Sequence, residues 1–124
     1  MGLDMYAYSV PAEAVIDDFS FKGGFKTEIA YWRKHNALHG WMKSHFEAKG
    51  GTGDFNCQPL RLTEDMLKEL RKQIKGKSLK CTSGFFFGGT YEYDDGLAER
   101  DLQFVLEALT IVRSGGAVYY DSWW

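Results

Sequence analysis

Two histidines four residues apart are the residues best suited to metal chemistry in this sequence. On a helix, His35 and His39 would share one face, where both imidazoles could reach a single metal ion. In zinc hydrolases with such a pair, the residue after the first histidine is a glutamate that acts as general base. Here that residue is Asn36, which cannot accept a proton, and no third ligand is indicated. We therefore predict no metal site and separate structural or ligand-contacting roles for the two histidines.

A binding surface is a better-supported hypothesis for the same segment. Trp32, Asn36 and His39 are spaced by four and three residues, which would place them on one helix face with Arg33 on its flank. Tryptophan offers a stacking surface, asparagine offers a donor and an acceptor, and histidine and arginine can engage phosphate or carboxylate. This pattern is compatible with a site for a base or nucleotide. It is also compatible with a core tryptophan among structural hydrogen bonds, and both interpretations stay open.

An aromatic run between glycines, CTSGFFFGGTYEYDDG at residues 81–96, is the second candidate segment. Its rings could line a pocket or fill the core. Its backbone N–H groups could surround an anion, but the GK[ST] ending of a phosphate-binding loop is missing, so NTP hydrolysis is not indicated. If this segment closes a ligand site, the rings that would contact the ligand are Phe86, Tyr91 and Tyr93.

Catalysis has little support in the sequence. No serine or cysteine lies in a recognisable catalytic context; the residues considered are Ser83, Ser122, Cys57 and Cys81. The acidic residues near position 94 lack the spacing of a calcium loop, and helix capping explains them more simply. The remaining enzymatic hypothesis uses His39 as an acid–base group with Asp94 or Glu92. We therefore favour a binding protein over an enzyme and expect no cofactor.

Two strands are predicted, one at each end of the chain. Residues 3–9, LDMYAYS, alternate between two faces, which is typical of a half-buried strand. One face would carry Leu3, Met5 and Ala7, and the other Asp4, Tyr6 and Tyr8. The tail AVYYDSWW, residues 117–124, should pair with the first strand, because a lone strand cannot satisfy its backbone. Residues 11–26 are expected to be irregular after Pro11.

Three helices are predicted between these strands. The first would begin after Thr27 as N-cap and end at Gly50-Gly51, followed by a glycine-rich loop over residues 50–59. The second would follow the cap Thr63, and the third would span residues 97–113. The apolar stripe of the second helix consists of Met66, Leu67, Leu70 and Ile74. We predict one α+β domain over residues 1–124, with three helices packed on a small, mainly antiparallel sheet that includes the N- and C-terminal strands.

Composition narrows the environment and the partners. A chain of 124 residues corresponds to one domain. The net charge of -2 provides no electrostatic footprint for duplex DNA or an anionic membrane. Asp4 interrupts the N-terminus before a signal peptide can form, and no segment approaches the roughly 20 apolar residues of a membrane span. We expect an unanchored cytoplasmic protein.

Four large rings close the chain. Because chain ends usually fray, rings at this position should be held in the core or at a partner, and exposed rings are typical of interfaces. A homodimer is therefore plausible. The four rings belong to Tyr119, Tyr120, Trp123 and Trp124.

The chain resembles a family of small phage proteins with no assigned function. The resemblance rests on MGLDMY at the start, EIAYWRKHNALHGWM in the middle, and TSGFFFGGTYEYDD together with the terminal YYDSWW. In that family the position of His35 is often alanine, whereas the residues matching Trp32, Arg33, Asn36 and His39 recur. The resemblance implies a viral protein that acts in the cytoplasm of a bacterial host.

Small phage proteins without catalytic motifs commonly counter host defence, and two mechanisms fit this sequence. In the first, which we favour, the protein is a sponge that sequesters a nucleotide-like ligand in an aromatic and polar pocket. In the second, it is an inhibitor that docks exposed aromatic and acidic residues onto a host nuclease or defence effector. A closed aromatic cavity would indicate the sponge, and a flat aromatic or acidic patch would indicate the inhibitor. A small nucleotide-acting enzyme that uses His39 is the third hypothesis.

Overall fold

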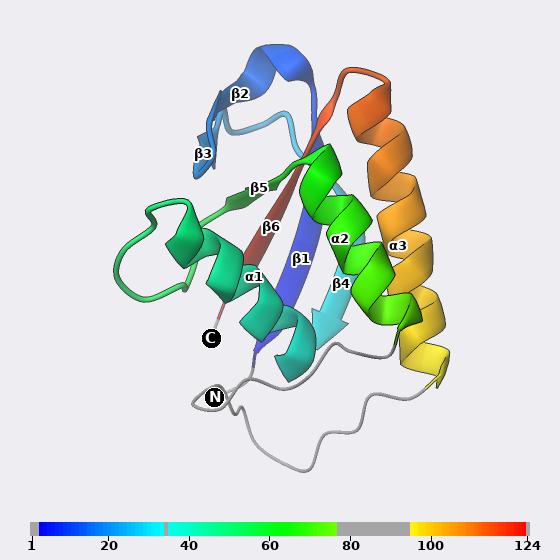
Figure 1. The fold of residues 1–124 in the computed structure, drawn as a ribbon. Helices are drawn as coiled ribbons and strands as arrows, with labels where there is room; N and C mark the ends of the chain where they lie inside the picture. Colours follow the sequence, from blue (N-terminus) through cyan, green and yellow to red (C-terminus); the bar gives the residue numbers. More distant parts are fainter. Residues whose placement is uncertain (1–2, 34, 77–94, 124) are drawn as a thin grey trace.

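The computed structural model describes residues 3–33, 35–76 and 95–123. Three helices cover one face of a four-stranded antiparallel sheet whose strand order is β4-β1-β6-β5 (Figure 1). The strands are β1 (Asp4–Val10), β4 (Thr27–Arg33), β5 (Leu60–Leu62) and β6 (Ala117–Trp123). The helices are α1 (Asn36–Ala48), α2 (Glu64–Lys75) and α3 (Asp95–Arg113). This architecture confirms the predicted α+β class, including the pairing of the two terminal strands.

The two central strands come from opposite ends of the chain. β1 pairs with β6 along its whole length, from Asp4 opposite Trp123 to Val10 opposite Ala117. The predicted alternation of β1 is confirmed, because Met5 and Ala7 are fully buried against the helices. Alternate side chains of a strand point to opposite faces, so the intervening residues of β1 lie on the face away from the helices.

The second and third helices follow their predictions closely. The Thr63 side chain accepts a hydrogen bond from the Met66 N–H and so caps α2. All four residues of the predicted apolar stripe of α2 are buried. α3 ends at Arg113, where Gly115 adopts a φ of 98°, a backbone conformation that favours glycine.

The predicted helix start at Thr27 is wrong. Residues 27–33 form strand β4, which pairs with β1 in a register that sets Trp32 opposite Met5 and Tyr31 opposite Tyr6. The segment is rich in aromatic and β-branched residues that suit a strand, and pairing with β1 supplies its backbone with partners. Helix α1 begins only at Asn36, where His35 is the N-cap and accepts a hydrogen bond from the Leu38 N–H.

Two further segments carry more structure than expected. Residues 11–26 contain a 3-10 helix, η1 (Ala12–Ala14), and a short hairpin of β2 (Val15–Asp17) and β3 (Ser20–Phe21). Residues 60–62, which were assigned to no element, form the edge strand β5. The three residues of β5 are too few for an alternating pattern to be recognised, so its pairing with β6 decides its conformation.

Candidate functional site

Trp32 and His35 converge on one buried carboxylate. The Trp32 indole N–H donates to Oδ1 of Asp101 at 2.8 Å, and Nε2 of His35 lies 2.6 Å from Oδ2 of the same residue. All three side chains are buried. A buried carboxylate is costly unless it is paired and hydrogen-bonded. The network therefore joins β4, the start of α1 and the face of α3.

His39, one turn after His35 in α1, is fully buried. Its Nδ1 lies 2.7 Å from the Tyr120 hydroxyl, and its ring stacks on Phe55 at 5.3 Å. Burial, together with the smaller effect of the nearby Lys43 charge, lowers the pKa of His39 to about 4. The imidazole is therefore neutral at physiological pH. Within the described ranges, no group of three His, Cys, Asp or Glu residues could hold a metal ion.

The predicted binding residues do not share one helix face. Trp32 lies on β4 and is buried, Asn36 is the first residue of α1, and His39 is enclosed in the core. Arg33 is exposed at the end of β4. The remaining predicted residues, Phe86, Tyr91 and Tyr93, lie outside the described residues. The prediction of a shared Trp32–Asn36–His39 face is wrong because the helix begins after Trp32.

Asp101 was not anticipated. It contacts Trp32 and His35, which lie 69 and 66 positions earlier in the chain. No local sequence pattern reveals contacts over such a separation. One signal was available: Asp101 lies four residues before Val105, so it falls on the apolar face of its helix. A carboxylate in that position indicates a buried polar partner.

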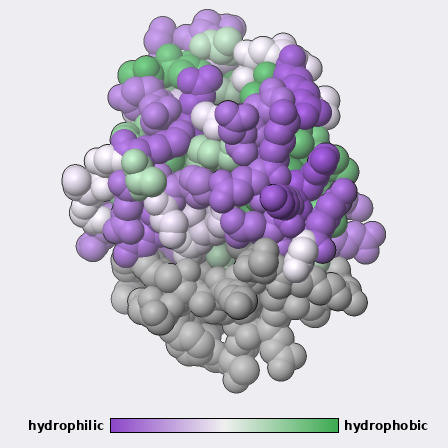
Figure 2. Space-filling view, viewed as in Figure 1, coloured by the Kyte–Doolittle hydropathy of each residue, from purple (hydrophilic) through white to green (hydrophobic). Residues whose placement is uncertain are grey.

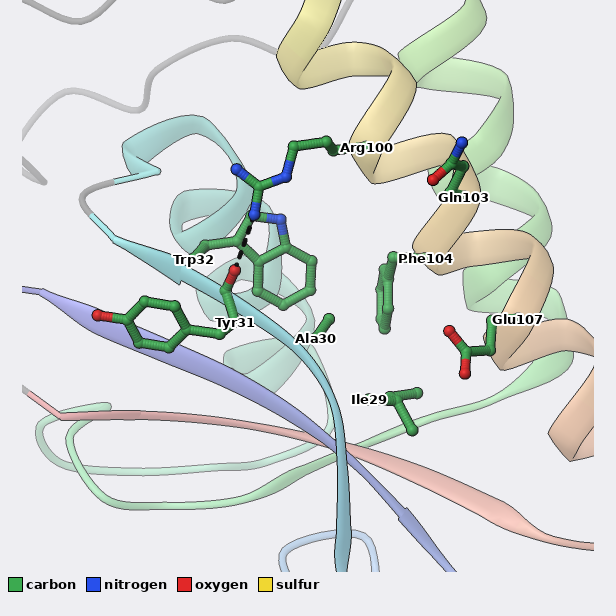
Figure 3. A pocket seen from close by; sticks show the side chains of 8 residues that line it. All are labelled: Ile29, Ala30, Tyr31, Trp32, Arg100, Gln103, Phe104 and Glu107. Carbon is green, nitrogen blue, oxygen red and sulfur yellow. Dashed lines mark hydrogen bonds between the residues drawn. The ribbon is translucent and has the colours of Figure 1, made fainter.

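A groove separates strand β4 from helix α3 (Figure 3). Its volume is about 190 Å³, below the roughly 300 Å³ at which typical small-molecule pockets begin. Trp32 and Phe104 meet edge to face at 4.9 Å in its wall, and Arg100 donates from Nη2 to the Tyr31 backbone carbonyl at 3.1 Å. The other lining residues are Ile29, Ala30, Gln103 and Glu107. The groove could accept one planar ring beside a guanidinium group, but not a whole dinucleotide.

The sheet face away from the helices carries a second, larger group of aromatic side chains. Directly paired residues of neighbouring strands point to the same face. Tyr6 is paired with Tyr31 on one side and Asp121 on the other, and Asp4 is paired with Arg33 and Trp123. We call this surface the tyrosine face; it consists of Asp4, Tyr6, Tyr8, Tyr31, Arg33, Asp121 and Trp123.

The rings of the tyrosine face are ordered by contacts with one another. Tyr6 and Tyr8 stack with 6.0 Å between ring centroids, and Tyr6 and Tyr31 are 5.3 Å apart. The Tyr31 hydroxyl donates to Asp4 at 2.6 Å, and this hydrogen bond raises the pKa of Tyr31. The ammonium group of Lys26 lies 4.5 Å from the centre of the Tyr8 ring. The surface is therefore preorganised before any partner arrives.

The β2–β3 hairpin closes one end of this face. Phe21 packs on Tyr119 at 4.7 Å, and the Tyr119 hydroxyl donates to the Asp17 carbonyl at 2.6 Å. The prediction that the terminal rings are docked is thus confirmed for Tyr119 and Tyr120, which are fully buried. Trp123 is instead 65% exposed, and Trp124 lies outside the described residues.

The open end of the tyrosine face combines rings with carboxylates. Tyr31 is 40% exposed, and Asp4 and Asp121 are half-buried beside the rings. Burial raises the pKa of Asp121, although the Ser122 N–H and the charge of Lys26 act in the opposite direction. A nearby cation stabilises the charged form of a carboxylate that is partly removed from solvent.

The surface on the helix side of the molecule is less aromatic than the tyrosine face. Its surface is mostly hydrophilic over α1 and α2, with an apolar area at the β2–β3 hairpin (Figure 2). Among the described residues, the hairpin exposes Ile16 and α3 exposes Leu106. Phe25, between β3 and β4, is also exposed.

Comparisons with protein-family models, with curated proteins and with solved structures find no match. Among the described helices, none is both long and apolar enough to cross a membrane.

Proposed function

We propose that this protein acts by binding another protein through its tyrosine face. In this proposal it is an accessory phage protein of the counter-defence type that inhibits a host nuclease or defence effector in the bacterial cytoplasm. The observation that carries the proposal is an exposed, preorganised set of rings at the open end of the sheet, with carboxylates among them. Tyrosine and tryptophan dominate the binding energy of protein interfaces because they bury large areas at a low entropic cost.

The carboxylates argue against single-stranded nucleic acid as the partner. Antiparallel sheets that bind RNA also present aromatic rings on an open face. Such surfaces pair their rings with basic groups that follow the phosphate backbone. Here Asp121 is the direct strand partner of Tyr6, and Asp4 accepts the Tyr31 hydroxyl. The two cations of this face, Arg33 and Lys26, are matched by these two carboxylates, so the described residues leave no excess of positive charge to follow a phosphate backbone.

The buried histidines argue against the enzymatic hypothesis. A general acid or base must reach the proton that it transfers, directly or through one water molecule. His39 is fully buried and bonded to Tyr120, and His35 is bonded to Asp101. In this arrangement neither imidazole has access to an external substrate.

The test is to isolate a complex from host lysate, purify both components, and measure their affinity. The double substitution Tyr31→Ser and Trp123→Ser should weaken binding at least tenfold, because it removes two exposed anchors. Leu106→Ser is the matched control, since it removes an exposed apolar side chain from the helix side. Equal weakening by the control, or unchanged affinity of the double variant, would reject the proposal. Self-association as the only interaction found would show that the face pairs two copies of this chain.

Nucleotide sequestration is the second candidate function, and the groove beside β4 favours it. Aromatic walls from Trp32 and Phe104 lie next to the Arg100 guanidinium group, which is the combination that binds a base and a phosphate. The test is a thermal-shift screen against mono-, di- and cyclic nucleotides, comparing Arg100→Ala with Arg113→Ala. Stabilisation by one nucleotide class that only Arg100→Ala abolishes would support the sponge, and no shift with any nucleotide would reject it.

A further inference from the structure

We propose that two copies of this chain pair through the outer edge of strand β4, antiparallel and related by a two-fold axis at Tyr31. The inference goes beyond the proposed function, because it concerns the edge of the sheet and does not depend on a host protein. In the dimer the two four-stranded sheets become one continuous sheet. The two tyrosine faces then meet at Tyr31 and form one surface.

The two edges of the sheet differ in how their backbone groups are occupied. At the β5 edge, the Arg61 N–H donates to the Asp18 carbonyl at 2.8 Å, and the Arg61 carbonyl accepts from Lys49 at 3.2 Å. β4 forms the other edge, and within the described residues it has a neighbouring strand only on its β1 side. It is seven residues long, against three for β5. A long edge of this kind is a template for pairing with another chain.

The backbone of β4 directs its groups to this edge at alternate residues. The Tyr31 carbonyl accepts from Arg100 on α3 at 3.1 Å, so it points away from β1. In an antiparallel strand, the N–H and the carbonyl of one residue point to the same side, and that side alternates along the strand. Glu28 and Arg33 occupy the same alternate positions as Tyr31 in the register with β1. All three residues can therefore form hydrogen-bonded pairs with an added strand.

Opposite charges stand at equal distances on the two sides of Tyr31. Glu28 and Arg33 are each two positions from Tyr31 in the register with β1, because a β-bulge takes up the extra residue on the Glu28 side. The β1 partners of Glu28, Tyr31 and Arg33 are Tyr8, Tyr6 and Asp4. The outer edge of β4 is therefore arranged symmetrically about Tyr31, with a carboxylate on one side and a guanidinium group on the other.

This arrangement is complementary to itself. In a two-fold symmetric interface, if residue i faces residue j, then j also faces i. A two-fold axis at Tyr31 sets Glu28 of each copy opposite Arg33 of the other, and it sets the two Tyr31 side chains opposite each other. Both charged side chains are exposed, and opposite charges and aromatic rings in direct cross-strand pairs stabilise an antiparallel pair. Sliding one strand by two residues would separate both charge pairs, so the charges also select the register.

Helix α3 flanks the same edge and shares this symmetry of charge. Arg100, Gln103 and Glu107 line the groove beside β4 and are exposed (Figure 3). The two-fold axis reverses the direction of the second α3, so the Arg100 end of each helix side lies towards the Glu107 end of the other. On pairing, Arg100 exchanges the Tyr31 carbonyl for this carboxylate, and the Tyr31 N–H of the second copy takes its place at the carbonyl.

The experiment is sedimentation equilibrium of the purified chain over a wide range of concentration. We expect a monomer–dimer equilibrium for the parent protein. Glu28→Arg and Arg33→Glu should each raise the dimer dissociation constant about tenfold or more, because each sets like charges opposite each other at two positions. An equimolar mixture of the two variants should recover the parent's dissociation constant to within about threefold, since every charge in the mixed dimer again faces its opposite. Trp123→Ser on β6 is the control and should leave the dimer unchanged.

A second measurement needs no substitution and so does not depend on how a variant folds. Hydrogen exchange of the Tyr31 amide, followed by NMR, should slow as the protein concentration rises, because this N–H is bonded only in the dimer. The Gly23 amide, in the exposed turn before β4, is the internal reference and should exchange at a constant rate.

Three results would overturn the inference. The first is a monomer at every concentration, with Tyr31 exchange independent of concentration. The second is a dimer that neither charge reversal weakens, or whose loss in two folded variants is not recovered by mixing them. The third is a dimer that Trp123→Ser weakens as much as the charge reversals do, which would assign self-association to the tyrosine face instead of the β4 edge.

Discussion

At the scale of single residues, Asp101 holds two elements to a third. Its two oxygens serve the Trp32 indole and the His35 imidazole, and all three side chains are buried. Asp101→Asn replaces one acceptor with a donor and leaves buried groups mismatched. We expect it to lower the free energy of unfolding by about 3 kcal/mol, the usual cost of breaking a buried pair. Urea unfolding measures the loss, and the exposed Glu107→Gln on the same helix should change stability by less than about 0.5 kcal/mol.

His39 makes stability depend on pH. Its pKa is about 4 in the folded protein, mainly through burial, against 6.5 as its ordinary value. The unfolded chain therefore binds a proton more readily, so protonation favours unfolding. The contribution of neutral His39 to the free energy of unfolding is complete above pH 6.5. As the pH falls from 6.5 towards 4, the free energy of unfolding decreases by up to roughly 3 kcal/mol.

Urea midpoints between pH 7.5 and pH 4 test this dependence. His39→Gln keeps a polar partner for the Tyr120 hydroxyl but cannot titrate, so its midpoint should fall less steeply over this range. Other groups titrate in both proteins, and the difference between the two curves isolates His39. Parallel curves would show that His39 does not carry the effect.

At the scale of elements, the turn after α1 is shaped by a close approach. A Cβ atom on Gly51 would lie 2.5 Å from the Phe46 ring. That ring is buried and packs on Phe19 at 5.3 Å and on Phe55 at 4.5 Å. It cannot move away without disturbing both neighbours, so Gly51→Ala should cost about 1–3 kcal/mol as an overpacked core does.

Gly23 provides the matched comparison for that substitution. A Cβ atom there would meet nothing within 4 Å, and the residue does not require a positive φ. Gly23→Ala should therefore leave the unfolding midpoint unchanged or raise it slightly, because alanine restricts the unfolded chain. If both substitutions had equal effects in thermal unfolding, the Phe46 contact would not be the cause.

At the scale of the whole molecule, the fold is closed by its last strand. β6 lies between β1 and β5, and it contributes Val118 and Tyr120 to the main core. A chain truncated after Gly115 loses this central strand and leaves one long side of β1 without a partner. We expect no cooperative thermal transition by circular dichroism for the truncated protein. Trp123→Ser keeps the strand and should retain a transition close to that of the parent, whereas a cooperative transition after truncation would contradict this account.

The parts of the fold that the sequence by itself determined are those with local physical signals. The alternation of residues 3–9 identified β1 and its buried side, because the period of two decides which side chains face the core. Thr63 and the apolar stripe that follows it defined α2, because the cap and the stripe lie within one short segment. The terminal rings were predicted to be held in the core or at a partner, and Tyr119 and Tyr120 are buried, whereas Trp123 is exposed.

Only the tertiary structure decided the conformation of residues 27–33 and the location of the site. The apolar and aromatic residues of that segment fit a helix or a strand, and pairing with β1 made it β4. That pairing buried Trp32 against Asp101 and turned Tyr31 outwards beside Tyr6. The open end of the sheet depends on the three helices covering one face and on the β2–β3 hairpin covering part of the other. A surface made by three strands from both ends of the chain has no local signature, because its residues become neighbours only through long-range backbone pairing.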